Sequence, residues 1–344
     1  MSGKRPCNPS GASVRTDGVE TPIAYRVLEA LGGRRAAYVR VPDIADALSC
    51  KHDDVCGAIG AIRRLGYPVS VRSGARIRLD TETDVIVRSD LLGRLGTRAL
   101  GRSPFCFLEL DSTNALATRA ALAGASHGTV VLAEHQKAGR GRLGRTWFSP
   151  PGAGLWFSLI LRYDLTVARA WMLTLGAAVA LADAVEALTG VHPDVRWPND
   201  LYLNNRKLAG ILTEVRGGGD RLEFAVLGIG INVNQGEADF PAGLRDTATS
   251  LRCGTARTYD RTALLAEALR SLEHVYAGLD AESIRGRWAG KTRMLGKPVC
   301  IDTDAGPVRG VAEDVGSDGA LLVRGADGGL RRVLAGDVGG GTTV

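Results

Sequence analysis

The sequence predicts an α+β protein built of three modules: a helical N-terminal module that ends in a hairpin, a mixed α/β body and a small C-terminal β domain. Apolar residues recur at helical spacing up to residue 65, and strand and helix patterns then alternate between residues 105 and 288. From Gly296 onward short strands are separated by turns that contain Gly and Asp. The chain has 344 residues, 45% hydrophobic and 23% charged, which suits two or three globular domains.

The first module is expected to hold three helices and a hairpin. Thr21 is placed to cap the first helix, with Pro22 in its first turn. Ile44 marks a short second helix, and Val55 to Leu65 mark a third. The stretch PVSVRSGARIRL then alternates around Ser73-Gly74, as a β-hairpin does. Three helices followed by a hairpin predict a winged helix-turn-helix. The expected boundaries are a disordered tail at 1–20, the winged helix at 21–80, a linker with some helix at 81–100, the body at 101–290 and a small β-barrel at 295–340.

The body is expected to alternate strands and helices. Strands are predicted at 105–110 and in GTVVLAEHQ, GLWFSLILR and RLEFAVLGIGINVN. The stretch DVRWPNDLYLNNRKLAGILTEVR predicts two strands joined at Asn204-Asn205. Helices are predicted directly after the strand at 105–110, at 166–188 and at 261–288.

The net charge of +6 is concentrated in the N-terminal quarter. Residues 1–80 hold 13 Lys and Arg against 8 Asp and Glu, so this quarter carries +5 of the total. A basic module on a nearly neutral body suggests that the module meets something anionic. The six cysteines show no metal-ligand spacing, and the first twenty residues lack the apolar segment of a secretory signal. The apolar run from Leu173 to Leu188 is interrupted by Asp183 and Glu186, so we expect a cytoplasmic protein without a membrane span.

The predicted hairpin of the body brings a cation and a carboxylate together. A two-residue turn at Asn204-Asn205 pairs Lys207 with Tyr202. In the same register Ala209 pairs with Asp200. Lys207 and Asp200 are then diagonal neighbours on one face, roughly 7–8 Å apart at the backbone. The pair is either a surface ion pair or a catalytic pair aimed into a cleft, and the run Trp-Pro-Asn-Asp before it favours the cleft.

Two further polar stretches lie at the ends of predicted strands. GIGINVN places Asn232 and Asn234 where an Asn either forms a turn or lines the mouth of a pocket. LDSTNALA places four polar side chains at a strand-to-helix junction. One of them suffices to cap the helix, so several polar groups at this N-terminus also suit a small polar ring or an anion.

A Gly-Arg segment lies between two predicted strands. Glycine lets backbone N–H groups approach a phosphate, and guanidinium groups neutralise its charge. A disordered RNA-binding tail would repeat this pattern in low-complexity sequence, whereas here it occurs once. The segment therefore predicts a loop that covers a phosphate, and its residues are Gly139, Arg140, Gly141, Arg142, Gly144 and Arg145.

Four stretches, DSTN, QKAGRGRLGRTWFSP, RWPNDLYLNNRKLAGILTE and GIGINVN, resemble biotin protein ligases in their order and spacing. With a winged helix in front, the chain resembles the group that combines a ligase with a repressor of the biotin operon. The resemblance covers about residues 22–338. It implies a central domain of the class II synthetase-like type and a C-terminal barrel of the SH3-like type.

The resemblance also implies a reaction and a set of site residues. Biotin and MgATP give biotinyl-5′-AMP and pyrophosphate, and biotin then passes to a lysine of the biotin carboxyl carrier protein. The catalytic residues are expected to be Lys207, Arg142 and Asp200, and no metal ligand set is expected from the protein itself. Biotin and ATP are expected to contact Ser112, Thr113, Asn114, Gln136, Arg140, Gly141, Arg142, Lys207, Gly210 and Asn232. Residues 235–250 are similar to the adenosine-side loop of the family, and a homodimer is expected of the group.

The chain departs from the family pattern at two places. Arg196 stands where the family has a lysine before Trp-Pro-Asn-Asp, which preserves the charge but not the geometry. The C-terminal domain ends in GDVGGGTTV without the basic residue that often follows there, which leaves its part in ATP binding open.

DNA binding by the first module is a separate hypothesis. The candidate contacts are Lys51, His52, Arg63, Arg64, Arg72 and Arg76. Asp53 and Asp54 near the start of the recognition helix repel phosphate, so a vestigial winged helix that only tunes the ligase is the alternative. Two other classes are less favoured. A transcription factor that merely senses biotin would not need Lys207 and Asp200, and a lipoate ligase should lack the GRGRLGR-to-WFSP block.

Overall fold

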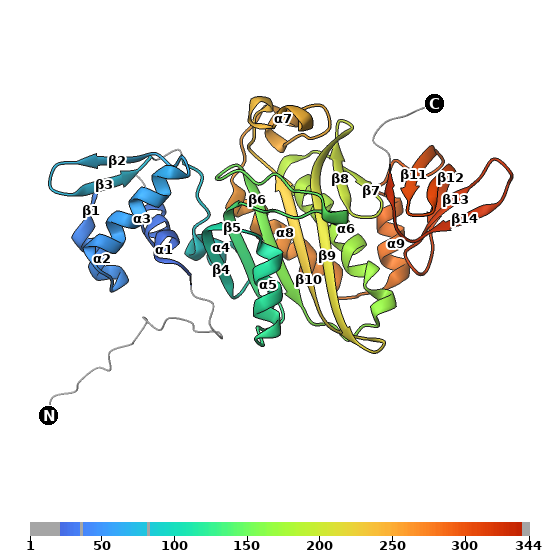
Figure 1. Ribbon diagram of the computed structural model, residues 1–344, viewed down its shortest axis with the longest axis horizontal. Helices are drawn as coiled ribbons and strands as arrows, with labels where there is room; N and C mark the ends of the chain where they lie inside the picture. Colours follow the sequence, from blue (N-terminus) through green and yellow to red (C-terminus); the bar gives the residue numbers. More distant parts are fainter. Residues whose placement is uncertain (1–20, 35–36, 81–82, 339–344) are drawn as a thin grey trace.

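The computed structural model describes residues 21–34, 37–80 and 83–338. The tail expected to be disordered at 1–20 lies outside the described residues. The three modules follow one another along the long axis of the molecule (Figure 1). The N-terminal helices lie at one end, the large sheet of the body lies in the middle, and the small C-terminal sheet lies at the other end.

The N-terminal module holds the three expected helices and the hairpin. Its core consists of apolar side chains from all three helices, among them Leu28, Ile44 and Ile62. Thr21 does not cap the first helix: the N-cap position is Pro22, and no side chain caps the helix there. The strands form an antiparallel sheet in the order β1-β3-β2. The elements are α1 (Ile23–Gly32), β1 (Val39–Arg40), α2 (Val41–Leu48), α3 (His52–Arg64), β2 (Val69–Arg72) and β3 (Arg76–Leu79).

Residues 83–100, expected as a linker, are packed into the protein. They contain α4 (Arg88–Arg94), and Val85, Ile86, Leu91 and Leu95 are each at most 1% exposed. The difference arises because these apolar side chains are buried in the two main cores: Val85 belongs to the core of the N-terminal module, and Ile86, Leu91 and Leu95 belong to the core of the body.

The body is a seven-stranded sheet in the order β4-β5-β6-β10-β9-β8-β7. Neighbouring strands are antiparallel except for β4 and β5, which run parallel. The stretch predicted as two strands forms three, because the cis Trp197-Pro198 peptide separates β7 from β8. The strands are β4 (Pro104–Leu110), β5 (Val130–Gln136), β6 (Gly154–Leu161), β7 (Asp194–Arg196), β8 (Asp200–Leu203), β9 (Arg206–Gly218) and β10 (Arg221–Asn232).

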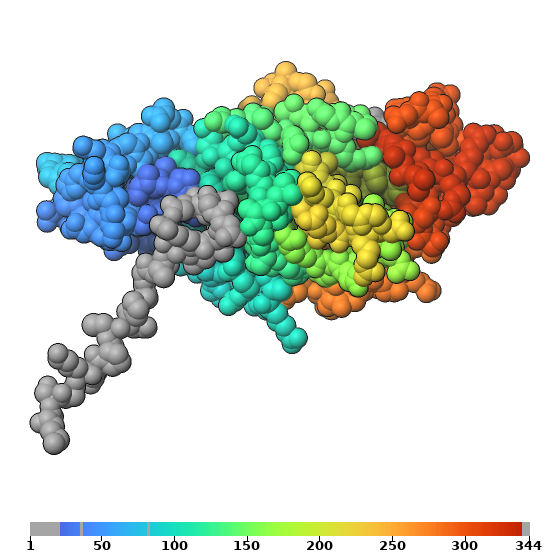
Figure 2. Space-filling view, turned by 60° about the horizontal axis from the view of Figure 1, so that its bottom comes forward, coloured from blue at the N-terminus to red at the C-terminus, as the bar shows by residue number. Residues whose placement is uncertain are grey.

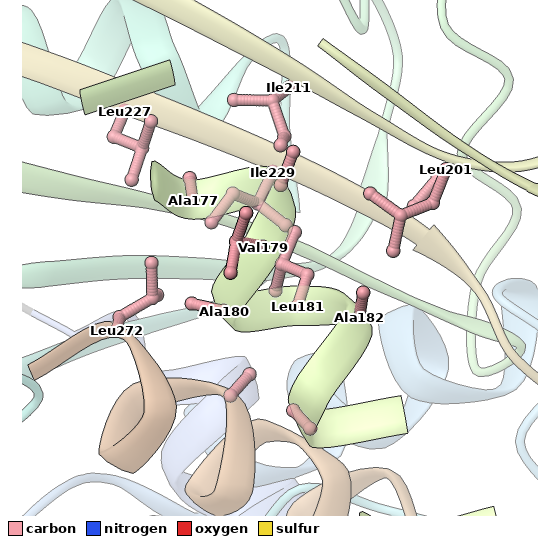
Figure 3. Packing of buried hydrophobic residues seen from close by; sticks show 14 of the residues in the cluster. Ala177, Val179, Ala180, Leu181, Ala182, Leu201, Ile211, Leu227, Ile229 and Leu272 are labelled. Atoms are coloured by element: carbon pink, nitrogen blue, oxygen red, sulfur yellow. The ribbon is translucent and has the colours of Figure 1, made fainter. Parts of the chain in front are cut away.

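Helices cover both faces of this sheet. One face is covered by α5 (Thr113–Leu122), and the other by α6 (Trp171–Thr189) and α8 (Arg261–Tyr276). In Figure 3, small side chains of α6 such as Ala177 and Val179 face Ile211 and Ile229 of the sheet. A single helix was predicted at 261–288, but the structure has two helices there. The first ends at Tyr276, and Asp280 caps the second, α9 (Ala281–Ala289). Among the described residues one helix, Val167–Thr189, is long and apolar enough to cross a membrane, and it is the central helix of this core.

The C-terminal module is a five-stranded antiparallel sheet in the order β14-β13-β12-β11-β15. Its apolar residues, among them Ile301 and Val323, belong to the same buried cluster as the body. The stretch LRRVLAGDV at the end of this module forms two short strands, β14 and β15, with the exposed Leu334 between them. The strands are β11 (Pro298–Thr303), β12 (Gly306–Val315), β13 (Leu321–Arg324), β14 (Leu330–Val333) and β15 (Asp337–Val338).

A buried cluster of charges joins the N-terminal module to the body. The fully buried guanidinium of Arg261 donates to Glu134 (2.8 Å), to the Asp84 carboxylate (2.9 Å) and to the backbone oxygen of Gly154 (3.0 Å). The hydroxyl of Tyr67, from the N-terminal module, donates to the same Glu134 carboxylate (2.6 Å). The cluster therefore ties the N-terminal module to the strand that carries Gln136.

Candidate functional site

A deep cleft lies on the α5 side of the body sheet. Its empty volume is about 1210 Å³, counting the part that is open to solvent. The loop at 137–148 and the loop at 235–250 contribute to its walls, and residues of β5, β8, β9 and β10 complete it. All the residues expected to be catalytic or to contact biotin and ATP line this one cleft, namely Ser112, Thr113, Asn114, Gln136, Arg140, Gly141, Arg142, Asp200, Lys207, Gly210 and Asn232.

One end of the cleft is a network of buried polar side chains. Ser112 caps α5 by accepting from the Ala115 amide, so the cap uses only one of the four polar side chains. The amide and the hydroxyl of Thr113 donate to the Gln136 side-chain oxygen (2.8 and 3.1 Å). Asn114 donates from Nδ2 to the Leu212 carbonyl (3.2 Å). The side chains are held in place before any ligand arrives, as a selective polar site requires.

Ser158 was not predicted from the sequence and belongs to this network. Its hydroxyl lies 2.8 Å from Thr113 Oγ1 and 2.6 Å from Asn114 Oδ1, and the side chain is fully buried. In the sequence it is the one hydroxyl within the apolar strand GLWFSLILR. A buried hydroxyl in a central strand needs a hydrogen-bond partner, and this need was the signal in the sequence that could have identified Ser158.

Three glycines make room for the side chains that line the cleft. A β-carbon on Gly228 would lie 2.0 Å from Asn114 Oδ1, and one on Gly230 would lie 2.4 Å from Trp147 Nε1. Gly210 also faces the Trp147 ring, at 2.9 Å from its would-be β-carbon. The Trp147 indole N–H is buried without a hydrogen-bond partner. It is therefore a donor that a ligand can satisfy, and Trp147 was not among the site residues predicted from the sequence.

The Gly-Arg loop folds into a compact lid at the mouth of the cleft. The Gly141 amide donates to the Arg145 carbonyl (2.7 Å), and Leu143 at the tip is 70% exposed with a positive φ of 53°. Arg142 donates to the Asn199 side-chain oxygen (3.0 Å). Arg140 forms an ion pair with Glu214 of β9 (3.1 Å). The loop arginines are therefore oriented by groups around the cleft.

The C-terminal module supplies one wall of the cleft. Asp337 of β15 lines it and forms ion pairs with Arg142 (3.7 Å) and Arg145 (2.5 Å), and Arg142 also donates to the Gly336 carbonyl (3.3 Å). In Figure 2 the green segment that holds the lid lies against the red C-terminal module. The sequence did not indicate whether this module takes part in ATP binding, and no local motif pointed to Asp337.

Lys207 and Asp200 meet inside the cleft. The ammonium lies 2.6 Å from the carboxylate, and the side chains are 32% and 19% exposed. The predicted register is correct at the turn, where Lys207 pairs with Tyr202, but Asp200 pairs with Gly210 and not with Ala209. One extra residue in β9 produces a bulge there, which a count along the chain cannot reveal.

The Asp200 carboxylate is largely buried. Burial raises its pKa, and the opposite charges of Lys207 and Arg142 act against this, while Asp337 adds to it. Its second oxygen, Oδ1, is buried without a hydrogen-bond partner. Lys207 also lies 5.6 Å from the centre of the Trp147 ring, which is within range of a cation–π contact.

Asn232 holds the second loop. Its Nδ2 donates to the Thr249 carbonyl (2.9 Å), and its Oδ1 accepts from Gln235 (3.1 Å). The loop also pairs with the backbone of Lys207, whose amide donates to the Thr247 carbonyl (2.7 Å). Asn232 therefore lines the cleft and anchors the loop, whereas Asn234 bonds to the Tyr259 backbone instead.

The six basic residues considered for DNA contact all lie on the N-terminal module, and the side chains of Arg63 and Arg72 already contact other groups there. Lys51, His52, Arg64 and Arg76 are exposed. The Arg63 guanidinium donates to the Val69 carbonyl (3.1 and 2.5 Å) at the start of the hairpin, so this contact competes with a contact to DNA. Arg72 stacks over the Tyr38 ring at 4.1 Å. Within the described ranges no group of three or more His, Cys, Asp or Glu side chains is placed to hold a metal ion.

The chain is similar to known biotin protein ligases in sequence and in fold. The biotin/lipoate A/B protein ligase family matches residues 106–232, and the biotin protein ligase C-terminal domain matches residues 294–338. The bifunctional ligase/repressor BirA of Bacillus spizizenii is 33% identical over 315 residues, which cover 91% of this chain and 97% of that protein. The biotin–[acetyl-CoA-carboxylase] ligase of Paracoccus denitrificans is 36% identical, covering 63% of this chain and 92% of its own length. A solved biotin protein ligase from Aquifex aeolicus in complex with biotin and ATP superposes with a TM-score of 0.58 at 30% identity, covering 69% of this chain and 98% of that one.

Proposed function

The chain belongs to the biotin protein ligase family, and from this premise we propose that it attaches biotin to a lysine of a biotin carboxyl carrier protein, through biotinyl-5′-AMP. One observation carries the proposal. A single cleft holds a preorganised polar network at one end and the pair Lys207–Asp200 beneath a lid of arginines at the other. A carboxylic acid with a polar head and a nucleotide would meet their complementary groups there. We place the reaction in the cytoplasm, where ATP is available.

The polar end of the cleft suits the ureido ring of biotin. Such a ring offers both donors and acceptors, and Ser112, Thr113, Asn114 and Gln136 present both kinds of group. The dithiolane ring of lipoate offers neither, so it would occupy this polar end of the cleft without forming hydrogen bonds to it. A site built for hydrogen bonds rejects a ligand that lacks them. The network therefore favours biotin over lipoate.

The first step joins two anions. A carboxylate oxygen of biotin attacks the α-phosphorus of ATP, a new O–P bond forms, and the bond to pyrophosphate breaks. Negative charge builds up on the phosphate oxygens, and cations fixed in advance stabilise it. Lys207, Arg140 and Arg142 are these cations, and Asp200 holds the Lys207 ammonium in place at 2.6 Å.

Mg²⁺ would accompany ATP in this scheme. It is normally bound through one or two carboxylates together with substrate phosphates, and it supplies neutralisation of the phosphate charge. The free, buried Oδ1 of Asp200 and the carboxylate of Asp337 at the same cleft fit that role.

The second step transfers biotin. The lysine amine of the carrier attacks the carbonyl carbon of the mixed anhydride, an amide bond forms, and the bond to AMP breaks. The departing phosphate keeps the electron pair, and the surplus proton leaves to solvent. The lid protects the anhydride from water until the amine arrives.

Lys207→Ala tests the assignment. We expect biotin-dependent exchange of pyrophosphate into ATP to fall by at least about a hundredfold, as when one stabilising group is lost from an active site. Arg216→Ala, further along the same strand, removes an exposed cation that does not line the cleft and should retain exchange. Exchange at the wild-type rate in Lys207→Ala would refute the assignment of Lys207 to adenylate formation. Transfer of labelled biotin to a carrier domain, with lipoate as the competing acid, tests the substrate.

We also propose that the N-terminal module binds operator DNA and represses transcription when biotin is plentiful. The hairpin at 69–79 carries Arg72, Arg76 and Arg78 and no acidic residue, which suits a clamp on the phosphate backbone. The match to the ligase/repressor of Bacillus spizizenii reaches into this module, because it covers 91% of the chain. The alternative is a vestigial module that only tunes the ligase.

A mobility shift on a biotin-gene promoter, with and without biotin and ATP, separates the two. Repression requires a shift with the adenylate bound, and it requires Arg76→Ala to weaken that shift and its dependence on salt. The absence of a shift with the adenylate bound leaves the vestigial module. We expect the adenylate-bound protein to be a homodimer, which sedimentation with and without ligands would reveal.

A further inference from the structure

A second cavity adjoins the ligand cleft. It has an empty volume of about 660 Å³, counting its open part, and lies where α6, the Trp-Pro-Asn segment, β9 and the turn before β13 meet. Arg142, Asn199, Ile211 and Leu212 line both this cavity and the ligand cleft. The hydrogen bond from Arg142 to the Asn199 side chain (3.0 Å) therefore stands at the boundary between the two spaces.

Among the described residues, two tryptophan side chains and a single charged side chain line the second cavity. Trp197 is fixed by a hydrogen bond from its Nε1 to the Gly319 carbonyl (3.0 Å). Thr174 donates to the Thr213 hydroxyl (2.7 Å) on the opposite side. Trp171 also lines the cavity, and its indole N–H is buried without a partner. Arg142 is the one charged side chain among the described residues that line it, and none of these residues is acidic.

These features match the chemistry of an acceptor lysine. A lysine attacks a carbonyl only as the neutral amine, and burial beside a positive charge lowers the pKa of an amine. A carboxylate would do the opposite, and the ligand cleft contains Asp200 and Asp337. The four methylene groups of lysine can lie against indole rings, as long charged side chains commonly do on apolar surfaces. The free indole N–H of Trp171 can bond to a carbonyl of the acceptor chain.

We propose that this cavity is the channel through which the lysine of the acceptor protein reaches the activated carboxyl group. The inference rests on the proposed function and extends it to the second step. The amine then passes the Arg142–Asn199 boundary, where this hydrogen bond opens, while the rest of the lid stays over the adenylate. Leu334, 70% exposed and part of the cavity wall, lies at the rim and contacts the acceptor.

Thr213→Phe tests the channel by filling it from β9. The enzyme is first loaded with biotinyl-AMP and then mixed with a carrier domain or with hydroxylamine, a nucleophile small enough to need no channel of this size. We expect transfer to the carrier to slow at least tenfold, as misplacement of a reacting group does. Pyrophosphate exchange and the hydroxylamine reaction should stay within about twofold, since the ligand cleft is untouched. Val215→Phe, two residues along the same strand and 43% exposed, lies outside the cavity and is the matched control.

Leu334→Glu gives a second test that does not disturb the core. A carboxylate at the rim should hold the incoming lysine as an ammonium ion and shift the pH profile of transfer to higher pH, whereas Leu334→Gln should not. Normal transfer in Thr213→Phe together with an unshifted profile in Leu334→Glu would overturn the channel. Absence of biotin-dependent pyrophosphate exchange in the wild type would instead overturn the proposed function. Should Thr213→Phe fail to fold, the pH profile of Leu334→Glu decides alone.

Discussion

Arg261→Met probes the buried charge cluster between the N-terminal module and the body. Arg261 is fully buried, and its guanidinium makes hydrogen bonds to two carboxylates, Glu134 and Asp84. Methionine fills much of the same volume but carries no charge. Glu134 would keep the Tyr67 hydroxyl (2.6 Å) and a long contact from the Ile86 amide (3.4 Å), and it would lose its counter-ion.

The expected cost follows from this uncompensated charge. Removing one partner of a buried ion pair destabilises a protein by about 3–5 kcal/mol. Glu134→Gln in the same chain removes the orphaned charge, so the double variant should regain a large part of the loss. The double-mutant cycle then isolates the interaction between Arg261 and Glu134. Tyr67→Phe alone should cost about 1.5–3 kcal/mol, because it removes a hydrogen bond to a charged group.

Denaturant unfolding of the full chain measures these differences. Arg94→Met is the matched control, because Arg94 also pairs with two carboxylates, Asp90 (2.8 Å) and Asp260 (2.7 Å), but is 41% exposed. Exposed pairs contribute about 0–1 kcal/mol each, so this variant should lose little. A loss in Arg261→Met no larger than that in Arg94→Met would refute the reasoning.

Three further outcomes are expected. Arg142→Ala removes the contacts of the lid to Gly336 and Asp337 that Arg142 makes and leaves only the exposed Arg145–Asp337 pair, so biotinyl-AMP should leak into the medium, as filtration of the labelled product would show; full retention would argue that Arg142 does not hold the lid closed. Gly230→Ala places a β-carbon 2.4 Å from Trp147 Nε1, so biotin should bind roughly tenfold more weakly, with Gly218→Ala, where a β-carbon meets open space outside the cleft, measured beside it by calorimetry; unchanged affinity would contradict the steric argument. Burial lowers the pKa of His127, whose Nδ1 accepts from the Arg162 amide (3.1 Å), so this residue contributes stability above the unfolded pKa of about 6.5 that is lost as pH falls below it. His127→Gln should unfold with a weaker dependence on pH between 8 and 5.5, and an identical dependence would exclude His127 as the cause.

The sequence located the chemistry of the cleft because each of its parts is local. The turn at Asn204-Asn205, the Gly-Arg lid and the polar N-terminus of α5 depend on neighbours within a few residues, and their spacing along the chain indicated one ligand site. The same local patterns indicated the helices of the N-terminal module, whose apolar spacing follows the helical period.

Contacts between distant segments were decided by the tertiary structure alone. Asp337 reaches the lid from the far end of the chain, Arg261 contacts Glu134 across 127 positions, and the second cavity exists only where α6, the Trp-Pro-Asn segment, β9 and the turn before β13 meet. The bulge opposite Leu201 and the room that Gly230 leaves for Trp147 likewise arise from packing. Hydrophobic and hydrogen-bonding patterns specify an element from residues close in sequence. Which elements touch depends on how whole faces pack together, and that information is spread over the entire chain.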